Sequence, residues 1–436
     1  MKQLKKFIIN GLILTFTTLI IHSIAMFFNA FISRKIGTEA VGLYGLITSI
    51  YSFSITIALS GLSLASTKII TEEITLYNFG DIKRIMKKCL CFSLLFSGLS
   101  SILLINFAPY ISSVWLHNKV STMPFYLIAI SLPFISMASC LTGYFAAIRN
   151  TIIPASEHIL EHLLKIILIS FFLNKFLPSG LEYTCLSLIL GNITSEILSF
   201  LYIYALYCFD KRKYTQYTPT KQFYIKRILN ISLPIGLTSC IRSGLSTLKQ
   251  ILIPLKFEKY GYSCKTALEN YGLINGMAMQ ILMFPSIIVS AYSSLLIPEF
   301  TEFKTNSDYK LIKKISTKAL LYTTCFSLII AILLFINSNK LSFTIYKNTN
   351  VSTYLKILCP LIPLIYVDTI IDSILKGLDK QITVLKINIL DLFSTILLII
   401  IVIPIFGIYG YIFTIYFSEI LNFTLSFKTL WKKVYF

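Results

Sequence analysis

The chain repeats itself at an offset of 227 residues, without a gap. Tyr44-Gly45-Leu46-Ile47 falls on Tyr271-Gly272-Leu273-Ile274, while Glu72, Asp81, Lys83 and Lys87 fall on Glu299, Asp308, Lys310 and Lys314. Apolar matches arise easily by chance, so the charged matches carry this alignment. In a membrane protein, a half-molecule used twice is typical of a transporter with its site between the halves.

The composition requires lipid as a solvent. Of 436 residues, 56% are hydrophobic and 13% are charged, whereas soluble domains carry about 25% charged residues. Apolar runs near the roughly 20 residues that span a bilayer recur along the chain, and backbone pairing in lipid makes them helices. An all-α fold with twelve spans is therefore predicted, at about 7–32, 43–66, 89–108, 124–148, 153–175, 181–208, 228–253, 272–296, 319–337, 352–375, 382–404 and 408–430.

The 39 Lys and Arg residues indicate the orientation. If both termini share one side, 26 of them fall on that side, 10 on the other, and three (Lys165, Arg242 and Lys249) inside spans. The basic side is expected to be cytoplasmic, so both termini are inside. The net charge of +20 then favours contact with anionic lipid headgroups, and no nucleic-acid partner is expected.

One long polar stretch divides six spans from six. Because six is even, the second half enters the membrane in the same orientation as the first, which predicts parallel repeats. The expected domains are an N-terminal six-helix bundle (1–208), a cytoplasmic basic linker (209–227) and a C-terminal six-helix bundle (228–436). The first apolar run reaches Ile32, too long for a signal peptide, so cleavage is not expected.

Two short basic segments, 81–88 and 308–314, admit two interpretations. Each alternates apolar and basic residues at helical spacing, as an amphipathic helix on the inner membrane surface does. They are therefore interpreted as surface helices, and the alternative is that each segment starts the next span. Prolines inside spans also predict kinks, at Pro133, Pro234, Pro285, Pro360 and Pro363.

The first and seventh spans carry polar side chains on one helical face. Thr15, His22 and Asn29 share a face of span 1, and the 227 offset sets them against Arg242, Lys249 and Lys256 of span 7. A two-fold axis would turn these faces toward a central cavity, and such a cationic, donor-rich cavity suits a phosphate or pyrophosphate. The alternative is that the lysines extend to the outer interface.

The fifth span contains the pattern His158-x-x-Glu161-His162, which resembles an inverted zincin motif. No third ligand is evident, so no metal is expected here, and Glu161 and Lys165 are interpreted as an ion pair at i and i+4. Asp368, Asp372, Asp391 and Glu196 also lie inside spans. Each is a proton or sodium site or a packing partner. No nucleotide loop, nucleophile elbow or catalytic dyad is present, so neither an enzyme nor a cofactor is predicted.

Several segments resemble the stage V sporulation protein B family. They are 36–44 with 65–68, then Gly143-Tyr144-Phe145 followed by Asn150, Pro154, Glu161 and Lys165, and finally 260–299 and 376–381. The resemblance covers nearly the whole chain and implies membership of the multidrug/oligosaccharidyl-lipid/polysaccharide flippase superfamily. It implies two six-helix bundles arranged as a V, as in multidrug and toxic compound extrusion (MATE) pumps.

The resemblance implies a flippase in the bacterial cytoplasmic membrane. Its substrate would be an anionic lipid-linked sugar precursor of peptidoglycan or another polysaccharide, moved by alternating access with proton or sodium coupling. A monomer is expected. Relatives usually have two further spans, which form a groove for the lipid tail. The alternatives are a cation-coupled multidrug pump and a non-transporting scaffold of cell-wall or sporulation assembly.

Overall fold

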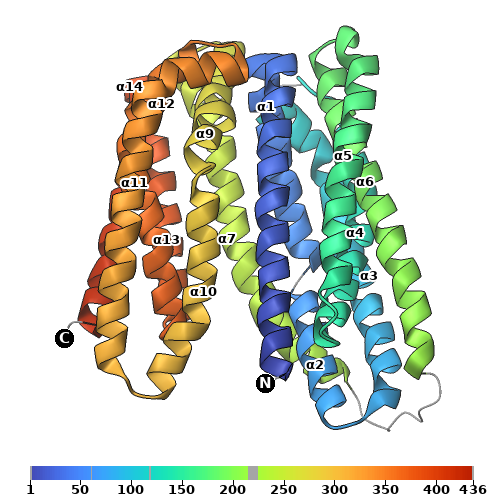
Figure 1. The fold of residues 1–436 in the computed structure, drawn as a ribbon. Coiled ribbons are helices and arrows are strands. Elements are labelled where there is room, and N and C mark those ends of the chain that lie inside the picture. Colours follow the sequence, from blue (N-terminus) through green and yellow to red (C-terminus); the bar gives the residue numbers. More distant parts are fainter. Residues whose placement is uncertain (1, 60, 117–118, 215–223, 435–436) are drawn as a thin grey trace. The chain divides into compact units, whose positions relative to one another are not determined.

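A computed structural model describes residues 2–59, 61–116, 119–214 and 224–434, apart from the side chains of residues 2–19, 22, 179, 213 and 214. Within these ranges every regular element is helical (Figure 1). The predicted all-α fold is therefore confirmed. The helices of the first half are α1 (Lys2–Leu59), α2 (Leu62–Thr75), α3 (Phe79–Tyr110), α4 (Met123–Ala147), α5 (Ile152–Phe176) and α6 (Leu181–Asp210).

The second half contains α7 (Ile225–Tyr260), α8 (Cys264–Tyr271), the π-helix η4 (Gly272–Ala278), α9 (Met279–Met283), α10 (Ser286–Thr305), α11 (Tyr309–Tyr346), α12 (Asn350–Leu358), α13 (Ile362–Gly377) and α14 (Gln381–Val434). Short helices of other types follow four of the α-helices, namely the π-helix η1 (Ile111–Trp115) and the 3₁₀-helices η2 (Leu177–Ser179), η3 (Lys211–Tyr214) and η5 (Cys359–Leu361).

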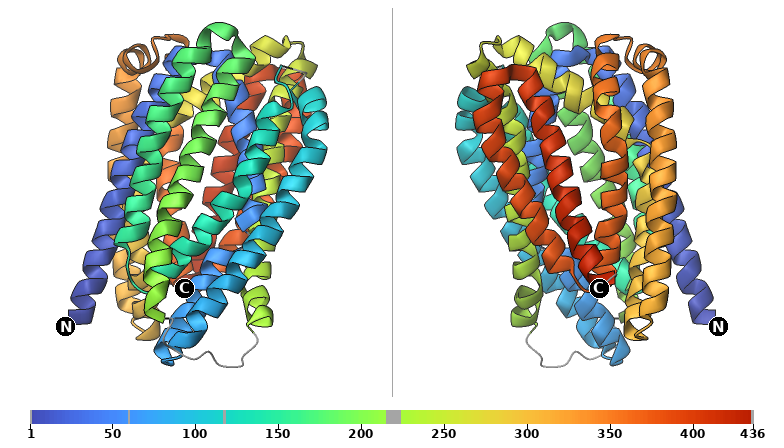
Figure 2. Two further views of the ribbon diagram at one scale, coloured as in Figure 1. Left: turned by 90° about the vertical axis from the view of Figure 1, so that its right-hand side faces the viewer. Right: turned by 90° about the vertical axis from the view of Figure 1, so that its left-hand side faces the viewer.

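Two of these helices are each two spans joined at a glycine. Gly37 (φ 80°) interrupts α1, and Gly407 (φ 58°) interrupts α14, which folds back on itself at one end in the right view of Figure 2. Among the described residues, eight helices are long and apolar enough to cross a membrane, or nine with one bent pair. Dividing α1 and α14, and adding the more polar α5, yields the twelve predicted spans.

Proline breaks the eighth predicted span. The segments Cys264–Met283 and Ser286–Thr305 meet at a bend of 59°, with Pro285 in the break, as its lack of an N–H predicts. The Tyr366 hydroxyl donates to the carbonyl of Leu282 at 2.8 Å. This bond pairs a backbone acceptor at the break, which an apolar environment requires.

The interpretation of 81–88 and 308–314 as surface helices is wrong. Both segments are the first turns of long continuous helices, α3 and α11. Ile82, Ile85 and Met86 are buried in a core formed with α2, α4 and α6. The amphipathic pattern did not distinguish the two cases, because the first turns of a spanning helix also have one buried face and one solvated face.

The repeat does not keep a constant register. Positive-φ residues recur at Gly37 and Gly261, 224 positions apart, but at Tyr77 and Ser307, 230 apart. The cause is length, because α10 has 20 residues where α2 has 14. The gapless 227 alignment averages these two registers. It holds for the positive-φ pair Gly180 and Gly407, 227 positions apart. At the other two pairs it is displaced by three residues, nearly one helical turn, so it still matches apolar faces there.

The described chain divides into two compact units. The first comprises Met1–Ile21 and Ile47–Gly244, and the second comprises His22–Leu46 and Leu245–Phe436. Both boundaries fall within α1 and α7, so these helices contribute to each unit. The predicted division into bundles 1–208 and 228–436, and their superposition, stays a prediction.

Small polar side chains hold helices together inside each unit. In the first unit, Thr67 on α2 donates to the carbonyl of Gly143 on α4 at 3.0 Å. In the second, Thr301 on α10 donates to the carbonyl of Gly377 on α13 at 3.2 Å. In both pairs the glycine has no side chain to separate the backbones. Such bonds contribute about 0.6 kcal/mol each inside a membrane.

Candidate functional site

The predicted stripe on spans 1 and 7 is described only in part. The side chains of Thr15 and His22 lie outside the described residues. Arg242 and Asn29 are exposed, and Lys249 is half-buried. Arg242 belongs to the first unit, whereas Asn29 and Lys249 belong to the second. Their convergence on one substrate therefore stays a prediction.

Lys249 lies near carboxylates of its own unit. Its charge acts on Asp391 and on Glu419, both of α14. No role was predicted for Glu419. At the 227 offset it aligns with Asn192, which belongs to a second polar group described below. Lys249 is thus within electrostatic reach of two carboxylates in the second unit.

Four carboxylates form what we call the C-terminal acidic group: Asp368, Asp372, Asp391 and Glu419. Asp368 interacts electrostatically with the other three. The predicted residues Asp368, Asp372 and Asp391 are therefore brought together by the fold of α13 and α14. Each of the four lies on an apolar span. Carboxylates that repel one another when ionised are therefore held together in the interior of one unit.

Hydrogen bonds fix these carboxylates unevenly. Ser418 donates to Asp391 Oδ1 at 2.8 Å, and Asn422 donates to Asp368 Oδ2 at 3.2 Å. Asp368 Oδ1 and Asn422 Oδ1 are buried without a hydrogen-bond partner in the described structure. Lys376 Nζ lies 3.6 Å from Asp372 Oδ2. The group thus contains free oxygen acceptors, the ligands that alkali cations and protons take.

A second cluster, the N-terminal polar group, consists of Tyr51, Glu161, Lys165, Asn192 and Glu196. Tyr51 donates a short hydrogen bond to Glu196 Oε1, and Asn192 Nδ2 donates to the same oxygen at 2.7 Å. Glu161 and Lys165 act on Glu196 electrostatically. Among the described atoms, Glu196 Oε2 and Asn192 Oδ1 are buried and have no partner.

Glycine allows α5 and α6 to bring these side chains close. A Cβ atom on Gly191 would lie 2.5–2.8 Å from atoms of Ile169, so only glycine fits at this contact between α6 and α5. Glu196 lies five residues further along α6, within electrostatic reach of Glu161 and Lys165 on α5. Asn192 and Glu196 share a helical face at i and i+4, a signal in the sequence that could have identified the pair.

The predicted Glu161–Lys165 pair is electrostatic rather than a close contact. Lys165 acts on the Glu161 carboxylate, but the basic atom nearest to it among the described ion pairs is His158 Nδ1, at 3.9 Å. No role was predicted for Glu157. Its side chain is buried, and its Oε1 accepts a hydrogen bond from Ser199 of α6 at 2.6 Å.

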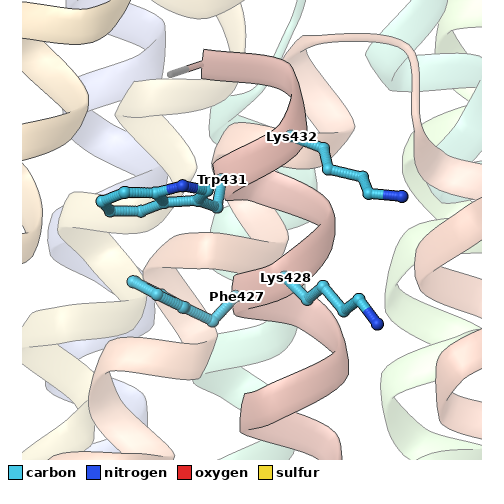
Figure 3. Close-up of a pocket in the computed structure, with 4 residues that line it drawn as sticks. All are labelled: Phe427, Lys428, Trp431 and Lys432. Carbon is cyan, nitrogen blue, oxygen red and sulfur yellow. The ribbon is translucent and has the colours of Figure 1, made fainter. Parts of the chain in front are cut away.

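The end of α14 forms a pocket with a different character. It is lined by Phe427, Lys428, Trp431 and Lys432, with the rings projecting to one side of the helix and the ammonium groups to the other (Figure 3). The rings of Phe427 and Trp431 lie 5.7 Å apart between centroids, with their planes tilted by 37°. Aromatic rings beside lysines are typical of a helix end at the membrane interface. The composition of this end of α14 is therefore that of an interfacial anchor and not of a transport site.

Comparison with known proteins identifies relatives over most of the chain. The model of a family described as polysaccharide biosynthesis protein matches residues 7–304. Stage V sporulation protein B of Bacillus subtilis (strain 168) is 24% identical over 353 residues, 80% of this chain and 68% of that protein. Sporulation protein YkvU of the same organism is 21% identical over 353 residues, 78% of each chain.

Solved structures match the fold. An inward-facing multidrug resistance MATE family transporter of the MOP superfamily gives a TM-score of 0.75 at 13% identity, covering 96% of this chain and 98% of the other. An outward-facing structure of such a transporter gives 0.65 at 14% identity, covering 98% and 95%. At these identities the likeness concerns the fold, and it confirms the predicted MATE-like architecture.

Proposed function

The chain belongs to the polysaccharide biosynthesis protein family, and on that premise we propose that it flips a lipid-linked sugar precursor across the bacterial cytoplasmic membrane. It is a multi-pass membrane protein with a MATE fold. In the proposal it works as a monomer with both termini in the cytoplasm. The headgroup passes through the protein while the lipid tail stays in the bilayer, and transport proceeds by alternating access.

The observation that carries coupled transport is the presence of a buried carboxylate group in each unit. The N-terminal polar group and the C-terminal acidic group both stand on spanning helices and both contain partnerless oxygens. A carboxylate in a membrane interior is costly and is retained where it serves an ion or proton pathway. We assign coupling by a proton or sodium ion to these two groups.

The substrate's charge follows from the cations. Arg242 is exposed and has a guanidinium fork that matches a phosphate. Lys249 is a compact charge held near Asp391 and Glu419. In this proposal a pyrophosphate-linked headgroup binds Arg242 and draws Lys249 away from its carboxylates, with His22, Thr15 and Asn29 adding donors.

A second candidate function is cation-coupled multidrug efflux. The C-terminal acidic group favours it, because four carboxylates attract a cationic drug, and the matched structures are multidrug transporters. Fold alone does not choose between the two functions. A scaffold without transport is the third possibility, and it predicts no flux of either substrate class.

The test is transport by the full chain reconstituted in liposomes. Fluorescent lipid-linked sugars are offered in one arm and a cationic dye in another, each with and without a proton or sodium gradient. Flipping of the lipid-linked sugar supports the proposal. Movement of the dye alone would establish the efflux function, and no flux in either arm would leave the scaffold.

A further inference from the structure

Three metal-ligating side chains gather near the start of α5. They are Glu157, His158 and Glu161, which we call the α5 donor group; one ligand atom from each lies within 4.8 Å of the other two. His158 Nδ1 is 3.5 Å from Glu157 Oε2 and 3.9 Å from Glu161 Oε2. The two carboxylates stand at i and i+4, with the histidine three residues before Glu161. Helical bundles hold metals with Glu and His three residues apart in the order Glu-x-x-His, and here the two residue types have the same spacing in the reverse order.

Glu157 provides an independent indication of a ligand. Its side chain is only 5% exposed. Ser199 donates to Oε1 at 2.6 Å, but Oε2, the oxygen that faces His158, is buried and accepts no hydrogen bond from any described residue. An unpaired buried acceptor is unfavourable, and more so when it is charged. A bound cation would remove that cost.

We propose that the α5 donor group binds one divalent transition-metal ion, with Zn²⁺ as the representative. One imidazole nitrogen and two carboxylate oxygens suit this ion. Tetrahedral bonds of about 2.0–2.2 Å place donor atoms about 3.3–3.6 Å apart. The 3.5 Å separation already fits, and the Glu161 side chain, 25% exposed, has room to close the longer distances.

This site differs from the pattern seen in the sequence. The inverted-zincin pattern pairs His158 with His162 and lacks a third ligand, which argued against a metal. In the structure Glu157 supplies that ligand, and the donor group does not include His162. The imidazole of His158 is 52% exposed, which gives an ion access. Three protein ligands leave a coordination position for water or for a phosphate oxygen.

The experiment is metal binding by the purified full chain in detergent, carrying no polyhistidine tag. After removal of metal with a chelator, Zn²⁺ is titrated by calorimetry and its stoichiometry is measured by elemental analysis. Co²⁺, which gives a coordination-dependent absorption spectrum, is the second probe. The variants are Glu157→Gln, His158→Gln and Glu161→Gln, with His162→Gln as the matched control on the same helix.

We expect one Zn²⁺ per chain in wild type and in His162→Gln, and a loss of affinity of at least about tenfold in each donor variant. Size-exclusion profiles and melting temperatures without metal show that each variant is folded. Absence of Zn²⁺ binding by wild type would overturn the proposal, as would equal affinity in His158→Gln. Because the readout is binding, it stands or fails separately from the proposed transport.

Discussion

Arg227 Nη1, near the start of α7, lies 2.7 Å from Glu73 Oε1 near the end of α2. The Glu73 side chain is 1% exposed, and its other oxygen accepts a bond from Asn78 at 2.9 Å. Arg227 also forms an ion pair with Glu72. One guanidinium thus compensates two adjacent carboxylates, one of them buried, and fastens the segment that follows the inter-repeat linker to the first unit.

Removing this guanidinium should destabilise the first unit. Arg227→Ala leaves the buried Glu73 carboxylate with Asn78 as its remaining partner, and because the guanidinium is 38% exposed, the loss should be about 1–3 kcal/mol, the cost of an unsatisfied buried acceptor. Arg227→Lys should recover part of the loss, because lysine keeps the charge but lacks a fork that reaches both carboxylates. The measurement is thermal unfolding of purified protein in detergent.

Lys226→Ala is the control for this prediction, since Lys226 is the neighbouring residue and is exposed. Its melting temperature should stay close to that of wild type. An equal decrease in both alanine variants would show that the loss comes from helix α7 generally and not from the ion pairs.

A close helix contact in the second unit should not tolerate a methyl group. A Cβ on Gly272 would lie 2.3 Å from the Thr38 carbonyl oxygen, so Gly272→Ala should cost about 1–3 kcal/mol through overpacking. Gly98 on α3 has open space around its Cβ position, so Gly98→Ala should be neutral or slightly stabilising. Melting temperatures compare the two, and similar values would contradict the contact.

Glu196 should be required for coupling. Glu196→Gln removes the charge that Tyr51 and Asn192 surround while preserving the size of the side chain. Glutamine keeps an oxygen that can accept from Tyr51 and Asn192, but it cannot carry the charge or bind and release a proton, so gradient-driven transport should decrease by roughly tenfold or more. Glu182, at the start of α6, accepts a hydrogen bond from the Ser121 amide. Glu182→Gln is the control and should retain transport. Gradient dependence that persists in Glu196→Gln would exclude this role.

Arg242 should bind the anionic headgroup. Arg242→Ala should reduce flipping by at least about tenfold, the worth of charge-assisted hydrogen bonds, and Arg242→Lys should rescue only part because it lacks the bidentate fork. Leu245→Ala, three residues further along α7, should be tolerated. Equal flipping by wild type and Arg242→Ala at matched expression would refute the assignment.

The spans and the break at Pro285 were predictable, whereas the glycine breaks and the partners of buried charges were not. Apolar runs of bilayer length dictate helices whatever surrounds them, so all twelve spans follow from the sequence. The repeat departs from the 227 register around α2 and α10 because α10 has 20 residues and α2 has 14, and a gapless comparison cannot show such an insertion. Similarly, Ile82, Ile85 and Met86 have the same pattern whether they face lipid or a core, and only the packing of α3 decides.

Partners of buried charges depend on which helices become neighbours. Glu73 meets Arg227, and Glu157 meets Ser199, across separations of 154 and 42 residues, which no local pattern encodes. The sequence identified Lys249 as a cation within a span, but its carboxylate neighbours come from α14. The sequence of each helix therefore predicts where charged residues stand, but it does not predict the contacts that determine their chemistry.

The role of Lys249 can be decided by a double-mutant cycle. Lys249→Ala leaves Asp391 and Glu419 without the cation that now acts on them, so it should reduce both stability and transport.

If Lys249 serves chiefly as their counter-ion, Glu419→Gln introduced together with Lys249→Ala should restore stability and part of the transport, because the unpaired charge is removed. If Lys249 chiefly binds the headgroup, the second substitution should restore stability while the affinity for lipid-linked sugar stays low. Substrate titrations on the four variants separate these results, and a double variant as unstable as Lys249→Ala alone would show that Glu419 and Lys249 are not coupled.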